Sequence, residues 1–235
     1  MNNPTTVSEM FLSRVEATPG REAFRYPTPS GWGRYSWREV GDKVRAIAGG
    51  LRALGLQNEQ RGGIICATRV EWILADLGIM CAGGATTTIY PSSTAEDCKY
   101  ILTDSGTQVL FAENEEQAAK IASVRAQLPE LKKVVVIDRA PGTQSDDGWT
   151  MPLADLMTLG DAWNQAHPGS YEENARSLRA ASLATLIYTS GTTGRPKGVE
   201  LTHDCWVYEG SAIEELLSLI HISEPTRLRR ISYAV

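Results

Sequence analysis

Short apolar segments alternate with amphipathic segments along the first 140 residues, and this alternation constrains the fold more than any other feature. Segments rich in β-branched and aromatic residues predict strands at residues 64–67, 86–90, 109–111 and 134–137. Apolar strands that alternate with helices are typical of a parallel sheet covered on both faces. We therefore predict an α/β domain over residues 1–139, with a mostly parallel, doubly wound sheet flanked by helices.

The helices are predicted by apolar spacing and by their start signals. Ser36 and Glu39 have the spacing of a capping box, and apolar residues follow at every third or fourth position to residue 54. Two similar boxes, at residues 68–71 and 93–96, predict further helices. An amphipathic helix is expected at residues 7–19, a hairpin at 21–36 and a helix at 115–128.

Composition changes after this domain. Residues 140–149 are rich in Pro, Gly, Ser and Asp, and residues 167–173 are again polar, so we interpret 140–179 as a connecting region with one short helix at 153–159. The segment 180–216 then predicts a buried strand at 183–188 and a helix at 206–216.

A segment rich in glycine and hydroxyl groups follows that strand. It consists of Thr189, Ser190, Gly191, Thr192, Thr193, Gly194, Arg195, Pro196, Lys197 and Gly198. Glycine lets backbone amides turn toward a ligand, and consecutive amides supported by hydroxyl groups bind anions. Lys197 adds a compact positive charge. Because open α/β sheets bind ligands beyond the carboxyl ends of their strands, the pattern predicts a phosphate-binding loop.

Other interpretations of this segment are weaker. The common P-loop needs Gly, four residues and then Gly-Lys-Ser/Thr, but Pro196 stands where its second glycine belongs. An ordinary solvated surface loop would not explain the preceding strand together with the spaced lysine. Ser190 lacks the G-x-S-x-G context of a hydrolase nucleophile. His203 has no identifiable partner, so we expect a helix-start or surface histidine rather than a catalytic base.

The string from Thr189 to Gly198 resembles the signature loop of the adenylate-forming enzymes, which include acyl-CoA synthetases, luciferases and peptide-synthetase adenylation domains. Residues 69–72, 83–85, 90–93 and 99–106 resemble the amino-terminal half of bacterial long-chain fatty-acyl-CoA synthetases. The resemblance implies that residues 189–194 bind the phosphates of ATP and that Lys197 is catalytic, pairing with the leaving pyrophosphate. It also implies that Thr189 approaches Mg²⁺.

The implied reaction is that of an ATP-dependent long-chain fatty acid:CoA ligase, with ATP, Mg²⁺ and the co-substrate coenzyme A. Two alternatives stay open: an enzyme that activates aryl, medium-chain or amino acids, and a non-catalytic nucleotide-binding module. In the family, the adenine contacts, the acidic Mg²⁺ ligand and the mobile-domain lysine lie further along the chain. We therefore expect an incomplete N-terminal domain of the adenylate-forming fold that is inactive alone.

The last residues depart from this family pattern. Residues 217–235 resemble an in-frame translation of a transposase-type sequencing-library adapter, in two fixed blocks separated by a short index. We therefore expect a non-native tail at 217–235, and its arginines carry no information about partners.

Charge and composition exclude several other classes. The net charge of −5 provides no basic surface for nucleic acid, and the most apolar region is interrupted by charged residues, so no membrane span is expected. The four cysteines and three histidines lack metal-ligand spacing. Free thiols and the absence of a signal peptide favour a cytoplasmic protein acting on fatty acid and nucleotide. Peripheral membrane contact and the oligomeric state stay open.

Overall fold

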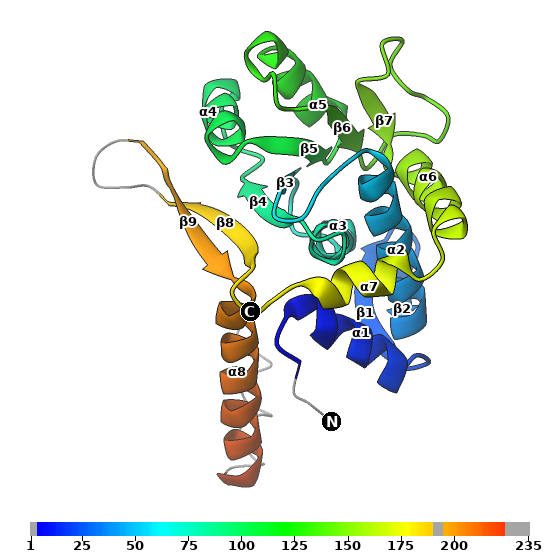
Figure 1. The fold of residues 1–235 in the computed structure, drawn as a ribbon, viewed down its shortest axis with the longest axis vertical. Coiled ribbons are helices and arrows are strands. Elements are labelled where there is room, and N and C mark those ends of the chain that lie inside the picture. The colour runs from blue at the N-terminus through cyan, green and yellow to red at the C-terminus, as the bar shows by residue number, and fades with distance from the viewer. Residues whose placement is uncertain (1–3, 190–194, 224–235) are drawn as a thin grey trace.

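Within the described residues, seven strands form one sheet in the order β7-β6-β5-β3-β4-β8-β9 (Figure 1). The computed structural model describes residues 4–189 and 195–223, with side chains to residue 213. The strands are β3 Arg61–Ile65, β4 Ala85–Ile89, β5 Thr107–Ala112, β6 Lys133–Val136, β7 Thr150–Pro152, β8 Leu183–Thr189 and β9 Lys197–Thr202. Every neighbouring pair is parallel except β8 and β9, which confirms the predicted mostly parallel sheet.

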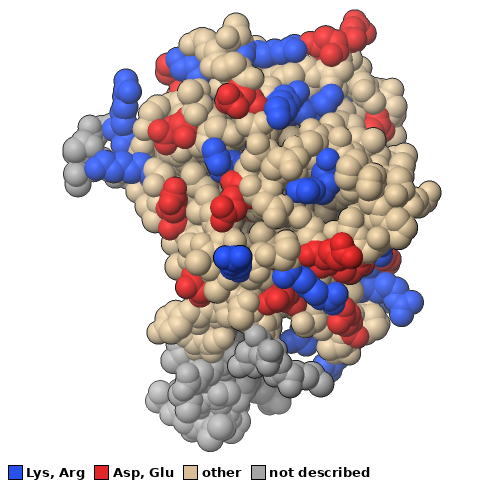
Figure 2. Space-filling view, viewed as in Figure 1, with Lys and Arg blue, Asp and Glu red and all other residues tan. Residues whose placement is uncertain are grey.

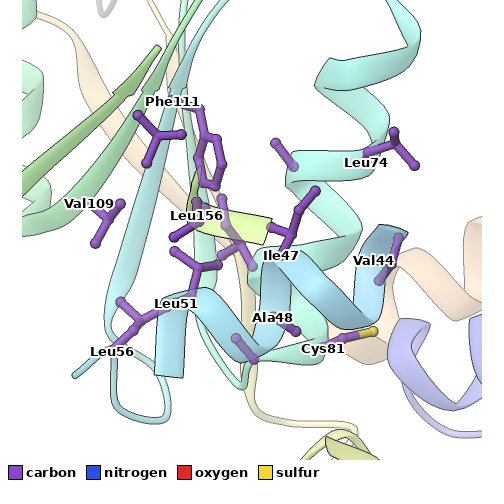
Figure 3. Packing of buried hydrophobic residues seen from close by; sticks show 14 of the residues in the cluster. Val44, Ile47, Ala48, Leu51, Leu56, Leu74, Cys81, Val109, Phe111 and Leu156 are labelled. Atoms are coloured by element: carbon purple, nitrogen blue, oxygen red, sulfur yellow. The ribbon is translucent and has the colours of Figure 1, made fainter. Parts of the chain in front are cut away.

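Helices cover both faces of the sheet. On one face lie α2 (Trp37–Ala53), α3 (Val70–Cys81) and α6 (Leu153–Ala166), and on the other lie α4 (Ala95–Ser105) and α5 (Glu115–Ala122). Alternate residues of β5 serve the two cores: Val109 and Phe111 pack with α2 and α6 (Figure 3), whereas Leu110 and Ala112 pack with α4 and α5. Burial on both sides explains the uninterrupted apolar residues at 109–112 in β5 and at 134–136 in β6.

The segment 140–179, predicted as a connection with one short helix, contains more structure than that. It supplies the edge strand β7, the 14-residue helix α6 and the helix α7 (Ser170–Ser177). Helix α6 packs closely on α2, and a Cβ added at Gly160 would lie 1.7 Å from the carbonyl oxygen of Ala46. The prediction failed because β7 has only three residues and because the α2–α6 contact depends on glycine, which carries no apolar signal.

The amino-terminal elements follow the sequence pattern. Helix α1 (Val7–Ala17) is capped by Thr6, and β1 (Glu22–Thr28) and β2 (Gly31–Ser36) form the expected antiparallel hairpin. The capping box of Ser36 and Glu39 is present at the start of α2. Helix α5 ends earlier than predicted, and a 3₁₀ turn at Arg125–Gln127 follows it.

Two predicted helix starts differ from the structure. The box expected at residues 68–71 is wrong: Arg69 is the N-cap of α3, and the Glu71 carboxylate instead accepts a hydrogen bond from Arg69 Nε at 2.6 Å. The box expected at 93–96 lies one residue later, between Thr94 and Asp97. In both places adjacent hydroxyl and acidic residues allow more than one register.

Helix α8 (His203–Ser223) follows β9 and is longer than the predicted helix at 206–216. Within the part of the chain that the structure describes, no helix is long and apolar enough to cross a membrane. On the face drawn in Figure 2, acidic and basic side chains are interspersed.

Candidate functional site

The base of the predicted phosphate loop lies at the β8–β9 turn. Thr189 ends β8, Lys197 begins β9, and these two residues are cross-strand partners in the antiparallel ladder. Both side chains are exposed, and they share one face of the sheet because directly opposed residues point the same way. None of the ion pairs between described side chains involves Lys197.

The other predicted loop residues, Ser190, Gly191, Thr192, Thr193 and Gly194, lie outside the described residues. Their contacts with phosphate, and the roles of Thr189 and Lys197, stay predictions. Among the described residues no cluster of three or more His, Cys, Asp or Glu is arranged to hold a metal ion. The Thr189 hydroxyl and the Lys197 ammonium are the chemical groups expected around a polyphosphate that carries Mg²⁺. The hydroxyl is an oxygen ligand, which Mg²⁺ prefers, and the ammonium can pair with phosphate oxygens.

Helix α4 contacts both strands of this turn. The Tyr188 hydroxyl donates to Asp104 Oδ2 at 2.7 Å, and the Tyr100 hydroxyl donates to the carbonyl oxygen of Pro196 at 3.0 Å. The two tyrosine rings meet edge to face, with centroids 6.5 Å apart. Burial, followed by the hydrogen bond to Asp104, raises the pKa of Tyr188 above its ordinary value, so this hydroxyl stays a donor.

An apolar cavity of about 850 Å³ lies on the opposite side of β8 from Tyr188. Its walls come from α1, β1, the start of α2, α3, the ends of β3 and β4, β8 and α8. They include Phe11, Phe24, Trp37, Trp72, Met80 and Trp206. Thr185 and Ile187 supply the β8 wall, and the indole Nε1 of Trp206 donates to Thr185 Oγ1 at 3.1 Å. Since strand residues alternate, Thr189 shares this face, roughly 7 Å beyond Ile187.

Two charged residues line this cavity. Arg14 extends from α1 and is exposed, and Asp76 on α3 is the one acidic residue among the described lining residues. Burial raises the pKa of the Asp76 carboxyl to about 6. The cavity therefore combines mostly apolar walls with a carboxyl group that is held closer to neutrality than in water.

His203 lies at the start of α8, as the sequence predicts, but it is not at the surface. Its side chain is fully buried, and Nδ1 accepts a hydrogen bond from the backbone N–H of Val7 at 3.3 Å. Burial lowers the pKa of His203, so the ring is held in its neutral form. His203 thus connects the starts of α1 and α8, and this contact gives it no catalytic role.

The cysteines are free: Cys66, Cys81 and Cys98 are buried, and Cys205 is exposed. This distribution is consistent with the predicted unpaired thiols.

The doubly wound sheet, with a glycine-rich turn and an apolar cavity beyond the end of one strand, defines a class of α/β proteins that bind ligands at strand ends. The family model described as "AMP-binding enzyme" matches residues 11–225. The chain therefore belongs to the AMP-binding enzyme family. The match extends nine residues past the boundary predicted at 216, while the nature of residues 217–235 stays a prediction.

Among curated proteins, the chain is 34% identical over 220 residues to the long-chain-fatty-acid–CoA ligase ACSBG2 of Rattus norvegicus, covering 94% of this chain and 32% of the relative. It is 38% identical over 178 residues to the long-chain-fatty-acid–CoA ligase FadD15 of Mycobacterium bovis, covering 76% of this chain and 28% of the relative. The chain thus spans about a third of the length of the curated relatives it matches.

Solved structures share the fold. The anthranilate CoA ligase AuaEII, in complex with anthranoyl-AMP, aligns with a TM-score of 0.63 at 22% identity, covering 86% of this chain and 36% of that one. The fatty acyl CoA synthetase of Mycobacterium tuberculosis aligns with a TM-score of 0.60 at 22% identity, covering 85% and 35%. These similarities confirm the fold predicted from the resemblance to adenylate-forming enzymes.

Sequence reasoning missed the α4 contacts and the carboxyl group in the cavity. Tyr100 and Asp104 are four residues apart in the predicted helix, so their shared face could have been found from spacing alone. Their partners Pro196 and Tyr188 lie 96 and 84 residues away, and no local pattern connects them. Asp76 interrupts an apolar helix, which was the one signal of an unusual carboxyl group.

Proposed function

We propose that this chain carries the phosphate-binding loop and part of the acyl-binding cavity of an ATP-dependent long-chain fatty acid:CoA ligase. One observation carries the proposal: Thr189 and Lys197 oppose each other at the carboxyl end of β8, on the strand face that also lines the apolar cavity. An acyl chain in the cavity would direct its carboxylate along β8 toward a polyphosphate at the turn.

In the proposed reaction a carboxylate oxygen of the fatty acid attacks the α-phosphorus of ATP, and the bond to the pyrophosphate oxygen breaks. The sulfur of coenzyme A then attacks the acyl carbon, and AMP leaves with the bonding electron pair. When bound, Mg²⁺ supplies positive charge to the phosphate oxygens, and Thr189 is the proposed residue of this chain that approaches it. Lys197, with donors from Ser190 to Gly194, stabilises the negative charge that develops on the leaving pyrophosphate.

We further propose that these 235 residues do not complete the reaction alone. Support comes from the length of the relatives, of which the chain spans about a third. The free, mostly buried cysteines support a reducing cytosol as the site of the reaction. The similarity to ligases named for long-chain fatty acids supports a long-chain substrate over aryl or amino acids.

The first experiment measures binding of ATP with Mg²⁺ by equilibrium dialysis. Lys197→Ala should weaken binding by about tenfold or more, because it removes a charged donor from phosphate. Lys132→Ala is the matched control, since Lys132 is also exposed but precedes β6, which is next to the strand at the opposite edge of the sheet. Equal ATP affinity in the wild type and Lys197→Ala would contradict the proposal.

A second measurement separates the alternatives. Trp37, Trp72 and Trp206 line the cavity, so a ligand that enters it should change tryptophan fluorescence. Palmitate is expected to bind more tightly than benzoate or an amino acid. Tight ATP binding with no response to any carboxylic acid would favour the non-catalytic nucleotide-binding module.

A further inference from the structure

The phosphate-loop turn extends beyond the part of the sheet that supports it. Strand β8 pairs with β4 from Thr185 to Ile187, and the ladder with β9 continues to Thr189. Tyr188 and Thr189 therefore have no pairing partner on the β4 side. Figure 1 shows β8 and β9 reaching out from the rest of the sheet. The ends of β8 and β9 need support from another element if Thr189 and Lys197 are to keep a defined position.

Helix α4 is built to give such support. The capping box of Thr94 and Asp97 satisfies its first turn, and Gly106 ends it in the left-handed conformation, with φ 62°. Tyr100 and Asp104 stand one helical turn apart and share a face. Both ends of α4 are thus defined by local chemistry, so the two side chains project from a fixed element.

The contacts from α4 reach both strands at the base of the loop. Asp104 accepts from Tyr188 on β8, and Tyr100 donates to Pro196, the residue before β9. The guanidinium of Arg195 also lies over the Tyr100 ring, 5.8 Å from its centroid. Tyr188 and Pro196, which lie on either side of the turn, are therefore both bonded to the same helix.

From this arrangement we infer that Tyr100 and Tyr188, with Asp104, are positioning residues that hold the ends of β8 and β9, and with them Thr189 and Lys197, in place for a phosphate ligand. The inference rests on the proposed function for the role of the loop, whereas the support of the hairpin by α4 is independent of it. Loss of either hydrogen bond should enlarge the set of conformations open to the described end of the hairpin, where Thr189 and Lys197 lie. Phosphate affinity then falls in proportion to the fraction of molecules in the competent conformation.

The test uses Tyr100→Phe and Tyr188→Phe, which remove one hydroxyl each and keep the rings. Tyr208→Phe is the matched control, because Tyr208 is exposed on α8. Hydrogen exchange of a peptide covering residues 186–198 is measured together with the affinity for inorganic pyrophosphate. Each variant should speed exchange in this peptide by about three- to tenfold and weaken pyrophosphate binding by a similar factor. The control should change neither, and exchange in β5 should stay as in the wild type.

The outcomes separate this inference from the proposed function. If wild-type protein does not bind pyrophosphate, the proposed function fails, and the exchange data alone decide whether α4 supports the hairpin. Unchanged exchange in both variants overturns the inference, as does faster exchange with unchanged pyrophosphate affinity. If a variant also speeds exchange in β5, Asp104→Asn is used in its place. The asparagine oxygen can still accept the hydrogen bond but carries no charge. That variant should reproduce the local effect in smaller size, and a wild-type exchange pattern in it overturns the inference.

Discussion

Asp76 makes folding stability depend on pH in a direction that can be worked out from its position. Its carboxyl lines the apolar cavity, and burial raises its pKa from 3.8 to about 6. The unfolded chain therefore releases this proton at lower pH than the folded chain. Between about pH 4 and pH 6, unfolding releases the proton, so the contribution of Asp76 to stability falls as pH rises.

The size of the effect follows from the shift. About two pKa units correspond to roughly 3 kcal/mol, since each unit is worth about 1.4 kcal/mol. Asp76→Asn carries no charge and avoids this penalty at every pH. We expect the variant to be more stable than the wild type by about 1–3 kcal/mol at pH 7.5, with the difference vanishing near pH 4.

Urea unfolding followed by tryptophan fluorescence at pH 4, 5, 6 and 7.5 measures this difference directly. Asp161→Asn on α6 is the control, because Asp161 is exposed and should change the profile little. Parallel stability profiles for the wild type and Asp76→Asn would refute the reasoning, since they would show that the carboxyl ionises alike in the folded and unfolded chains.

Two further predictions concern packing and helix starts, and urea unfolding tests both. Gly160→Ala should destabilise the protein by more than about 2 kcal/mol, because the new Cβ would overlap the backbone of α2 at Ala46, whereas Asp161→Ala next to it should cost far less. Ser36→Ala should cost about 1 kcal/mol, because it removes the hydroxyl that accepts the backbone N–H of Glu39; a loss below about 0.3 kcal/mol would contradict a structural role for this cap.

The sequence predicts the fold wherever burial produces a regular pattern. Strand β5 and helix α2 illustrate this. Burial on both faces of the sheet makes residues 109–112 of β5 apolar without interruption, and the single buried face of α2 gives its apolar residues helical spacing. The predicted start of α3 was wrong. A capping box there would need the Glu71 carboxylate, but that carboxylate accepts a hydrogen bond from Arg69. At α6 the predicted helix 153–159 begins at the right residue but ends too early, because the close backbone approach at Gly160 leaves no apolar side chain to recognise.

For the site, the sequence could identify the glycine-rich turn because its residues are contiguous. The position of Thr189 at the end of a strand follows from the order of segments, whereas strand β9, which begins at Lys197, was not predicted. What holds the turn could not be found in this way, since Tyr100 and Pro196 meet only through the tertiary fold. Polar contacts between residues far apart in the sequence leave no local pattern, whereas short contiguous motifs can be recognised directly.

Strand β8 separates two tasks by the alternation of its side chains. Thr185 and Ile187 line the cavity, while Tyr188 faces the other way, packs against the core under α4 and bonds to Asp104. Substitutions on the first face should change the size and polarity of the cavity without disturbing the hairpin. Substitution of Tyr188 should alter the phosphate loop without changing the cavity. One strand can therefore place an apolar ligand and a polyphosphate near the same end. The residues that line the cavity differ from those that hold the hairpin against α4.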